Sequence, residues 1–488
     1  MRFPLDARDL SLSLTDTWTR AGNRIADFLT PSLRLGVTGL ARSGKTVFIT
    51  ALIRNLTEGG RLPFFTPYAD GRLVSADLEP QPDDAVPRFD YEAHVHALSG
   101  DPPAWPESTR RISELRVALS FTPEHTLRRM LGIRRLNLDI VDYPGEWLLD
   151  LAMLNQSYAA WSREAMERAR RSSEAATATA WRAYAEAQDP NGPEDEKRAR
   201  TGAELFTRYL IDARATAAVA TLGPGRFLMP GDLEGSPLLT FFPLDVPDDA
   251  TPLRGSLWAM MARRYESYVD HVVRPFFRDH FSRLDRQIVL VDVLGALAGG
   301  PEGVAELEHA LAAVLSAFRP GVANWLQSLV GARRIDRLLF AATKADHIHH
   351  TSHDRLEAIL SLLTQRAAEH AGAAGADTRV MALAALRATR EARITEGRAT
   401  LPCIVGVPLP GETVSGETFD GKREVAVFPG DLPEDPRDVL TAEAALTTAF
   451  PRFRPPRLKS VQPWGEVPPP PHIRLDRALD YLIGDWLQ

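Results

Sequence analysis

The chain has 488 residues, of which 44% are hydrophobic and 25% charged, as is typical of soluble globular proteins with two or three domains. A formal net charge of −7 argues against nucleic acid as the main partner, because binding a phosphate backbone needs a clustered basic face. The single cysteine, Cys403, excludes an intrachain disulfide and a thiolate metal site, and it favours a cytoplasmic location.

The N-terminus lacks the charged-then-apolar order of a signal peptide, and no apolar run has the length of a membrane span. The longest run, residues 288–300, carries Asp292 and is interpreted as a buried strand. The sequence therefore predicts no transmembrane segment, and a peripheral membrane partner is left open.

The first 150 residues predict an N-terminal helix followed by the first part of an α/β core. We assign residues 1–30 to the helix, centred on 8–29, and residues 31–150 to the core. Within the core, a strand, a helix and a hairpin are expected over 32–39, 46–57 and 113–145. The intervening residues 58–107 are rich in Pro, Asp and Gly, and predict mostly loops.

Residues 151–285 predict a large helical insertion. Apolar side chains recur there at helical spacing from Leu151, and "DPNGPEDE" at 189–196 divides the segment into two helices. Pro275 is expected to kink or break a later helix.

The core is predicted to resume over residues 286–390. Strands are expected at 286–294, 334–346 and 378–386, with helices at 303–317 and 354–370 between them, the second capped by Asp354. Strands that alternate with helices predict a mainly parallel sheet flanked by helices.

Residues 391–488 predict a small extension packed on the core. It should contain a β-hairpin turning at Asp420-Gly421 within 417–428, proline-rich loops at 455–471, and a final helix that docks on the body through one apolar face.

The segment "GLARSGKT" at 39–46 fits the pattern G-x-x-x-x-G-K-[ST], with a predicted strand before it and a predicted helix after it. Glycines in such a loop let successive N–H groups point at phosphate oxygens, and the helix N-terminus adds partial positive charge. Lys45 would reach the terminal phosphates and Thr46 would offer its hydroxyl to Mg²⁺. The predicted phosphate-binding residues are Gly39, Arg42, Ser43, Gly44, Lys45, Thr46 and Val47.

Two further motifs follow predicted strands, at the edge where α/β sheets bind ligands. Asp142 could hold Mg²⁺ through water, and Gly145 could present its N–H to a γ-phosphate. The run from Asp292 to Gly295 matches the same D-x-x-G pattern but is expected to lie inside a strand, so we favour the first.

The segment "TKAD" at 343–346 indicates a site for a purine base. The carboxylate of Asp346 could accept from the adjacent N1–H and N2 amine of guanine, a donor pair that adenine lacks. The stem of Lys344 would cover the ring, and His347 could pack beside it.

Together "GLARSGKT", "DYPGEW" and "ATKADH", separated by long insertions, resemble the translation-factor-related P-loop GTPases, and specifically the YcjX-like family of bacterial stress-associated GTP-binding proteins. The resemblance implies a P-loop GTPase-like fold, GTP or GDP with Mg²⁺ as ligands, and GTP hydrolysis. Hydrolysis is expected to be slow because Glu146 stands in place of the usual glutamine. It implies guanine-reading roles for Thr343, Lys344 and Asp346, and places the last base-contact loop at Ala385 and Leu386. An unidentified protein partner would bind the helical insertion.

The catalytic residues are the least determined. Lys45 is expected to take part, and Thr109 is our choice for the first-switch residue that completes the Mg²⁺ site, although a capping role fits it equally. Glu146 stands where many GTPases carry a water-orienting glutamine. Arg110 or Arg111 could act as an arginine finger, or both could be surface residues.

Three alternatives stay open at this point. The protein could be a nucleotide-regulated scaffold with negligible turnover, or an ATPase with a coincidental "TKAD". The histidines of "HIHHTSH" at 347–353, of which His349 and His353 are four residues apart, could bind Zn²⁺ if helical, or form a solvated loop.

Overall fold

The computed structural model describes residues 30–39, 42–107, 111–124, 132–170, 175–215, 223–247, 251–316, 335–373, 375–396, 399–414, 416–441, 450–458 and 471–488. The helix expected at 8–29 lies outside these residues, as does Thr109.

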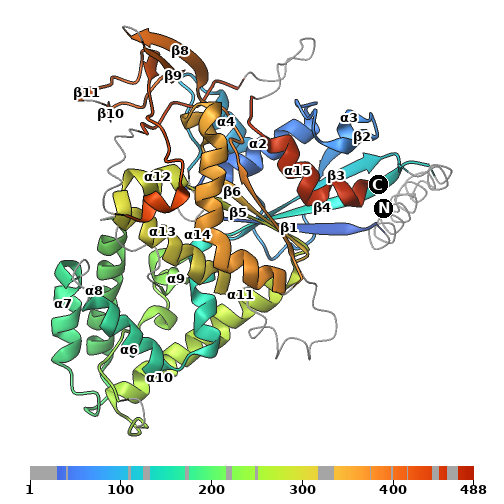
Figure 1. The fold of residues 1–488 in the computed structure, drawn as a ribbon. Helices are drawn as coiled ribbons and strands as arrows, with labels where there is room; N and C mark the ends of the chain where they lie inside the picture. The colour runs from blue at the N-terminus through green and yellow to red at the C-terminus, as the bar shows by residue number, and fades with distance from the viewer. Residues whose placement is uncertain are drawn as a thin grey trace, which may run out of the picture.

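A seven-stranded sheet forms the centre of the molecule (Figure 1), in the order β2-β3-β4-β1-β5-β6-β7. The strands are β1 (Ser32–Gly39), β2 (Leu73–Glu79), β3 (Ser113–Phe121), β4 (Arg134–Asp142), β5 (Arg286–Val291), β6 (Arg337–Ala342) and β7 (Asp377–Ala382). Strands β4, β1, β5, β6 and β7 are parallel, whereas β3 pairs antiparallel with both β2 and β4. The α/β fold with a mainly parallel sheet is confirmed, as is the β3–β4 hairpin.

Strand β2 is the strand of this sheet that the sequence analysis missed, and two helices, at Thr66–Ala69 and Tyr91–Ser99, also form in the segment expected to be mostly loops. Strand β2 lies at the sheet edge, and its side chains are mostly half-buried or exposed. Such a strand carries no continuous apolar run, and the surrounding Pro- and Asp-rich residues masked its alternation.

Helices cover both faces of the sheet because its buried strands carry apolar side chains on both sides. On one face, Ile288 and Leu339 pack in a cluster with side chains of α2 (Lys45–Thr57) and α15 (Leu475–Ile483). On the other, Val289 and Leu338 pack in a cluster with α12 (Val293–Ala298), α13 (Gly300–Ser316) and α14 (His353–Ala373). The helix α4 (Tyr91–Ser99) lies beside α2. The short helix α3 (Thr66–Ala69) precedes β2.

The helices between β4 and β5 form a lobe below the sheet in Figure 1. They are η1 (Gly145–Asn155), α6 (Tyr158–Ala169), α7 (Ala175–Glu186), α8 (Glu196–Ala215), α9 (Gly225–Leu228), α10 (Leu257–Tyr268), the π-helix η4 (Val269–Val273) and α11 (Arg274–Asp279), with short 3₁₀ turns at Gly231–Leu233, Pro237–Leu239 and Phe281–Arg283. Aromatic rings fill the lobe, with Trp161 in edge contact with Phe206 and Phe241. None of the described helices is long and apolar enough to cross a membrane.

The breaks predicted in this segment are observed. Residues 189–196 separate α7 from α8, and the π-helical turn η4 immediately precedes the turn of α11 that contains Pro275. A π-helical turn interrupts the regular ladder of backbone hydrogen bonds just before the proline, which lacks an N–H to continue it.

The C-terminal extension contains two small sheets. Strands β8 (Arg390–Glu396), β9 (Ala399–Gly406) and β12 (Val425–Val427) form one sheet, and β10 (Thr413–Val414) with β11 (Glu417–Thr418) forms the other. The final helix α15 docks on the core, as predicted, and Ile473 just before it exchanges backbone hydrogen bonds with Ala384.

The hairpin predicted around Asp420-Gly421 is wrong. The local turn does form, because Asp420 accepts from the N–H of Lys422 and Gly421 takes a φ of 76°. Its flanking strands, however, pair with β10 and β9 rather than with each other. A turn signal reports local backbone geometry, while the partner of a short strand is chosen by long-range packing.

Two predicted boundaries also move. Strand β7 ends at Ala382 instead of residue 386, which leaves the residues after it in a loop. Helix α14 begins at His353, so Asp354 occupies its first turn instead of capping it.

Candidate functional site

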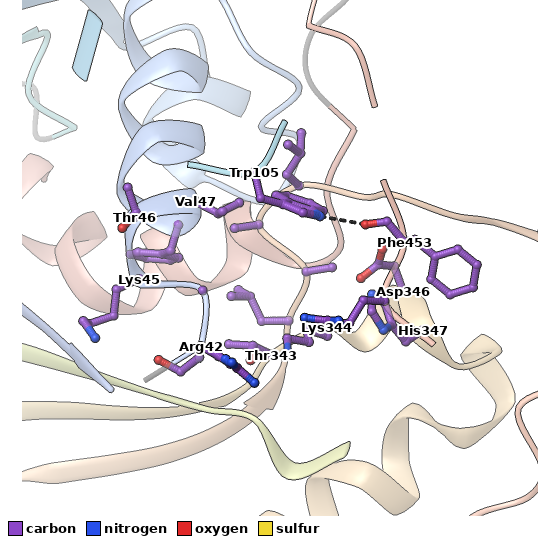
Figure 2. A pocket seen from close by; sticks show the side chains of 18 of the residues that line it. Arg42, Lys45, Thr46, Val47, Trp105, Thr343, Lys344, Asp346, His347 and Phe453 are labelled. Carbon is purple, nitrogen blue, oxygen red and sulfur yellow. Dashed lines mark hydrogen bonds between the residues drawn. The ribbon is translucent and has the colours of Figure 1, made fainter. Parts of the chain in front are cut away.

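The predicted motifs lie at one edge of the sheet. Strands β1, β4, β5, β6 and β7 are parallel, so their carboxyl ends meet there. A cavity of about 360 Å³ opens at this edge (Figure 2). Of the residues predicted from the sequence it is lined by Arg42, Ser43, Gly44, Lys45, Thr46, Val47, Thr343, Lys344, Asp346, His347, Ala385 and Leu386.

The loop between β1 and α2 is shaped by its glycines. Gly44 has a φ of 86°, a left-handed conformation that side chains rarely adopt, and it lets α2 begin directly at Lys45. At Gly39, the last residue of β1, a Cβ would overlap Ser43 Oγ and the carbonyl oxygen of Leu290 in β5, so only glycine fits at this position. Although not part of the cavity lining, Gly39 accepts a hydrogen bond of 2.8 Å from Lys45 Nζ.

Two side chains of this loop are arranged to receive an anion. Lys45 is only 8% exposed, and its ammonium group donates to a backbone carbonyl; it pairs with no carboxylate in the part of the chain that the structure describes. The hydroxyl of Ser43 is buried and has no hydrogen-bond partner among the described residues. A buried donor without a partner is costly, and a phosphate oxygen would satisfy it.

The loop after β6 holds Asp346 in a fixed position. Its Oδ2 accepts from the N–H of Ala388 at 2.7 Å, and its carbonyl accepts from the hydroxyl of Thr389. Thr343 bonds to β5, since its N–H donates to the carbonyl of Val291 at 2.9 Å. The loop after β6 and the chain after β7 are therefore joined at the aspartate.

Lys344 takes a left-handed φ of 59° and forms an ion pair with Asp292. The expectation that Asp292 lies inside a strand is wrong. Strand β5 ends at Val291, and Asp292 caps α12 by accepting from the N–H of Gly295 at 3.0 Å. The aspartate satisfies the helix N-terminus, and the Leu and Ala residues after it favour helix over strand.

Several lining residues were not found from the sequence: Trp105, Pro106, Leu409, Arg452 and Phe453. Trp105 Nε1 donates to the carbonyl of Phe453 at 2.6 Å, and the Phe453 ring meets His347 edge-on at 5.2 Å (Figure 2). Burial lowers the pKa of His347, which keeps its ring neutral and suited to an apolar contact. The only local signal for these residues was a tryptophan in an otherwise polar loop.

Residues 33–487 match the model of the YcjX-like family, DUF463. The chain belongs to the YcjX-like family. It is 38% identical over 467 residues to a protein of Escherichia coli (strain K12) named Ras-like GTPase YcjX, covering 93% of this chain and 96% of that protein. A second relative of that name, from Shewanella oneidensis (strain MR-1), is 36% identical over 478 residues, covering 93% and 95% of the two chains.

In this YcjX-like chain, the loop after β4 leads into the helical lobe. Asp142 is buried at the end of β4, paired in register with Val37 of β1. Gly145 begins the 3₁₀ helix η1. Glu146 is only 1% exposed and lies outside the cavity lining in this conformation.

Contacts made by Glu146 and the residues after it hold η1 against the rest of the helical lobe. The guanidinium of Arg226 lies 3.3 Å above the Trp147 ring, and a Cβ at Gly225 would overlap the backbone of Glu146. The buried carboxylate of Asp150 accepts from the N–H of Gly225 at 2.6 Å and from the hydroxyl of Tyr268 at 2.7 Å. Burial raises the pKa of Asp150 to about 6, despite these two hydrogen bonds. Movement of the D-x-x-G loop would therefore directly disturb the contacts that η1 makes with α9 and α10.

The predicted Mg²⁺ ligands fit a hard cation in chemical type. The hydroxyl of Thr46 and the carboxylate of Asp142 are both buried oxygen donors, as Mg²⁺ prefers. The first-switch candidate Thr109 and the arginine-finger candidate Arg110 lie outside the described residues, and the other arginine-finger candidate, Arg111, is exposed.

Proposed function

We propose that this protein binds guanine nucleotides with Mg²⁺ and hydrolyses GTP slowly, as a molecular switch. One observation carries the proposal. The G-x-x-x-x-G-K-[ST] loop and the "TKAD" loop, some 300 residues apart in sequence, line one cavity at the carboxyl edge of the sheet. Relatives that share more than a third of their residues with this chain carry the name Ras-like GTPase.

At the phosphate end, the residues of the loop would act as donors. Lys45 would exchange its bond to the Gly39 carbonyl for the terminal phosphates, and the hydroxyl of Ser43 would gain a partner. Bound Mg²⁺ supplies charge neutralisation of the phosphates; Thr46 and Asp142 would hold it, with Thr109 as the expected third ligand.

At the base end, Asp346 would read guanine. One carboxylate accepts both the N1–H and the N2 amine, whereas adenine presents no such donor pair. The bond from Ala388 holds the carboxylate in place and leaves its second oxygen and remaining lone pairs for the base. The stem of Lys344 and the rings of His347 and Trp105 would cover the purine faces.

Slow hydrolysis is the proposal for turnover. Glu146 stands at the position expected to orient the attacking water, yet it is buried outside the cavity and an acidic group there repels the γ-phosphate. The D-x-x-G loop would have to move for Glu146 to act, and its contacts with α9 and α10 would pass that movement to a partner of the helical lobe. We place this switch in a bacterial stress-associated process on the family resemblance alone.

The decisive experiment tests whether Asp346 sets the preference for guanine over other bases. Calorimetric titrations with Mg²⁺ would compare GDP, ADP and xanthosine diphosphate on the wild-type protein and on Asp346→Asn. We expect the wild type to prefer GDP over ADP, and the variant to lose GDP affinity by at least about 100-fold while gaining xanthosine diphosphate, because the donor and acceptor are exchanged at one position.

Asp435→Asn, at an exposed turn of the C-terminal extension, is the matched control and should behave as the wild type. Equal binding of GDP and ADP by the wild type would reject guanine recognition. Binding of GTP without phosphate release over hours would leave a nucleotide-regulated scaffold in place of a GTPase.

A further inference from the structure

The histidine-rich segment 347–353 is only partly used by the proposed nucleotide site. His347 lines the cavity, and His353 Nε2 donates to the carbonyl of Ala345 at 2.9 Å, which stabilises the turn that carries Asp346. The helical pair of His349 and His353 considered from spacing does not form, since the chain before His353 is a 3₁₀ turn.

A different group of ligands forms instead. Glu391 of β8 lies against the two histidines, and one ligand atom from each of His349, His350 and Glu391 lies within 4.8 Å of the others. The closest pair is His350 Nδ1 and Glu391 Oε2 at 2.7 Å, and His349 Nε2 lies 3.8 Å from the same oxygen.

We propose that His349, His350 and Glu391 bind a Zn²⁺ ion. Two imidazole nitrogens and one carboxylate oxygen form a ligand set that zinc commonly takes, with water in the fourth position. Metal–ligand bonds of about 2.0–2.1 Å in a tetrahedron place ligand atoms roughly 3.4 Å apart, between the two distances observed here. His350 is 58% exposed, so its ring can rotate to close the set.

The surroundings support the two least mobile ligands. His349 is buried, and its Nδ1 lies 3.0 Å from the hydroxyl of Thr351 and accepts from the N–H of the same residue at 3.4 Å, contacts that orient the ring so that Nε2 faces Glu391. When Nε2 binds zinc, Nδ1 would carry the proton and donate it to the Thr351 hydroxyl. The guanidinium of Arg387 repels a cation electrostatically, but it lies 3.6 Å from Glu391 Oε1, which is not the oxygen that would bind zinc. The ligand oxygen Oε2 is shared by the two histidines.

The position of this site predicts what zinc would do. The segment from Asp346 to His350 and the segment from Ala388 to Glu391 are already joined through Asp346. The hydrogen bond between His350 and Glu391 is a second link between the same two segments, and zinc would replace it with metal–ligand bonds that also include His349. We infer that zinc holds Asp346 in its base-reading position and slows nucleotide release; this inference rests on the proposed function, whereas zinc binding does not.

The first test is a zinc titration of the full chain purified without a histidine tag, with a chromophoric chelator as competitor. We expect one equivalent of Zn²⁺ on the wild type, and at least tenfold weaker binding by His350→Ala and by Glu391→Gln. His271→Ala removes an exposed histidine of η4 and should bind zinc as the wild type does. Equal zinc affinity of the wild type and both ligand variants would overturn the site.

The second test measures release of a fluorescent GDP analogue with Mg²⁺ present, with and without one equivalent of Zn²⁺. We expect release at least about fivefold slower with zinc in the wild type, and no zinc effect in His350→Ala. Equal release rates with zinc bound would overturn the inference that zinc slows nucleotide release. A failure to bind GDP in any condition would reject both the proposed function and that inference, and the zinc titration would still decide the metal site.

Discussion

Gly225 packs closely against the backbone of Glu146 in the D-x-x-G loop. This contact offers a quantitative test of how η1 is held against the rest of the helical lobe. A Cβ at residue 225 would lie 2.5 Å from the carbonyl carbon of Glu146 and closer still to its oxygen. Real Cβ atoms essentially never approach below 3.0 Å, so Gly225→Ala must separate the two backbones by more than the 0.5 Å that the carbon alone requires, because the oxygen is closer.

Two costs follow from that separation. Overpacking a buried contact costs about 1–3 kcal/mol. The displacement also stretches the 2.6 Å hydrogen bond from Gly225 to the buried carboxylate of Asp150, and a bond of this charged type contributes about 1.5–3 kcal/mol. Alanine reduces the entropy of the unfolded chain and returns up to about 1 kcal/mol. We therefore expect Gly225→Ala to destabilise the lobe by about 1.5–6 kcal/mol.

Urea unfolding followed by tryptophan fluorescence is the assay, because Trp147, Trp161 and Trp181 are all buried in the lobe. Gly223→Ala is the matched control, since a Cβ there meets its nearest neighbours at an ordinary 3.7 Å. The reasoning is refuted if both variants unfold at the urea concentration of the wild type, because the close approach would then carry no energetic cost.

Three further predictions concern other parts of the molecule. Burial raises the pKa of Asp150 from about 3.9 in an unfolded chain to about 6, so the folded state holds this proton more tightly and stability falls as the pH rises from about 4 to about 6. The stability of the wild type relative to Asp150→Asn should decline by up to about 3 kcal/mol across that range, measured by urea unfolding at each pH; a constant difference would show that the carboxyl is not buried in the protonated form. Trp105→Phe removes the donor to the Phe453 carbonyl while keeping an aromatic ring, and it should speed GDP release about fivefold, the equivalent of one hydrogen bond of about 1 kcal/mol. Unchanged release in stopped-flow measurements would remove Trp105 from the wall of the site. Arg286→Met breaks the ion pair between the buried Arg286 and Asp485 behind α15 and should lower stability by about 1–3 kcal/mol in thermal unfolding, with an unchanged melting curve as the contrary result.

The candidate site was predicted from the sequence where a motif depends on neighbouring residues. The residues from Gly39 to Thr46 specify a strand, a left-handed glycine and a helix start within one short segment, and the structure has all three. The residue types of "TKAD" likewise indicated an acceptor at a strand end, and Asp346 lines the cavity. The local geometry of such short motifs can be predicted because backbone conformation and nearby hydrogen bonds are set by the local chain.

Contacts between distant segments could not be predicted in the same way. Trp105 and Phe453 meet across nearly 350 residues, and neither position carries a pattern that names the other. The Asp420-Gly421 turn was recognised correctly, yet its strands joined different sheets. For Asp292, the apolar residues on both sides suggested a strand and hid its local role as a helix cap. Its pairing with Lys344 depended on where β6 placed the lysine.

From its amino-acid order alone, this protein specifies an α/β core and the glycine-containing loop between β1 and α2, because those features arise from periodicity and from residues a few positions apart. Which side chains close the cavity, how η1 engages the helical lobe, and that Glu391 joins two histidines 41 and 42 positions earlier were decided only by folding. These features depend on packing between segments that are far apart in the chain. The local sequence of each segment does not identify its partner, because each segment alone is compatible with many partners and burial selects one.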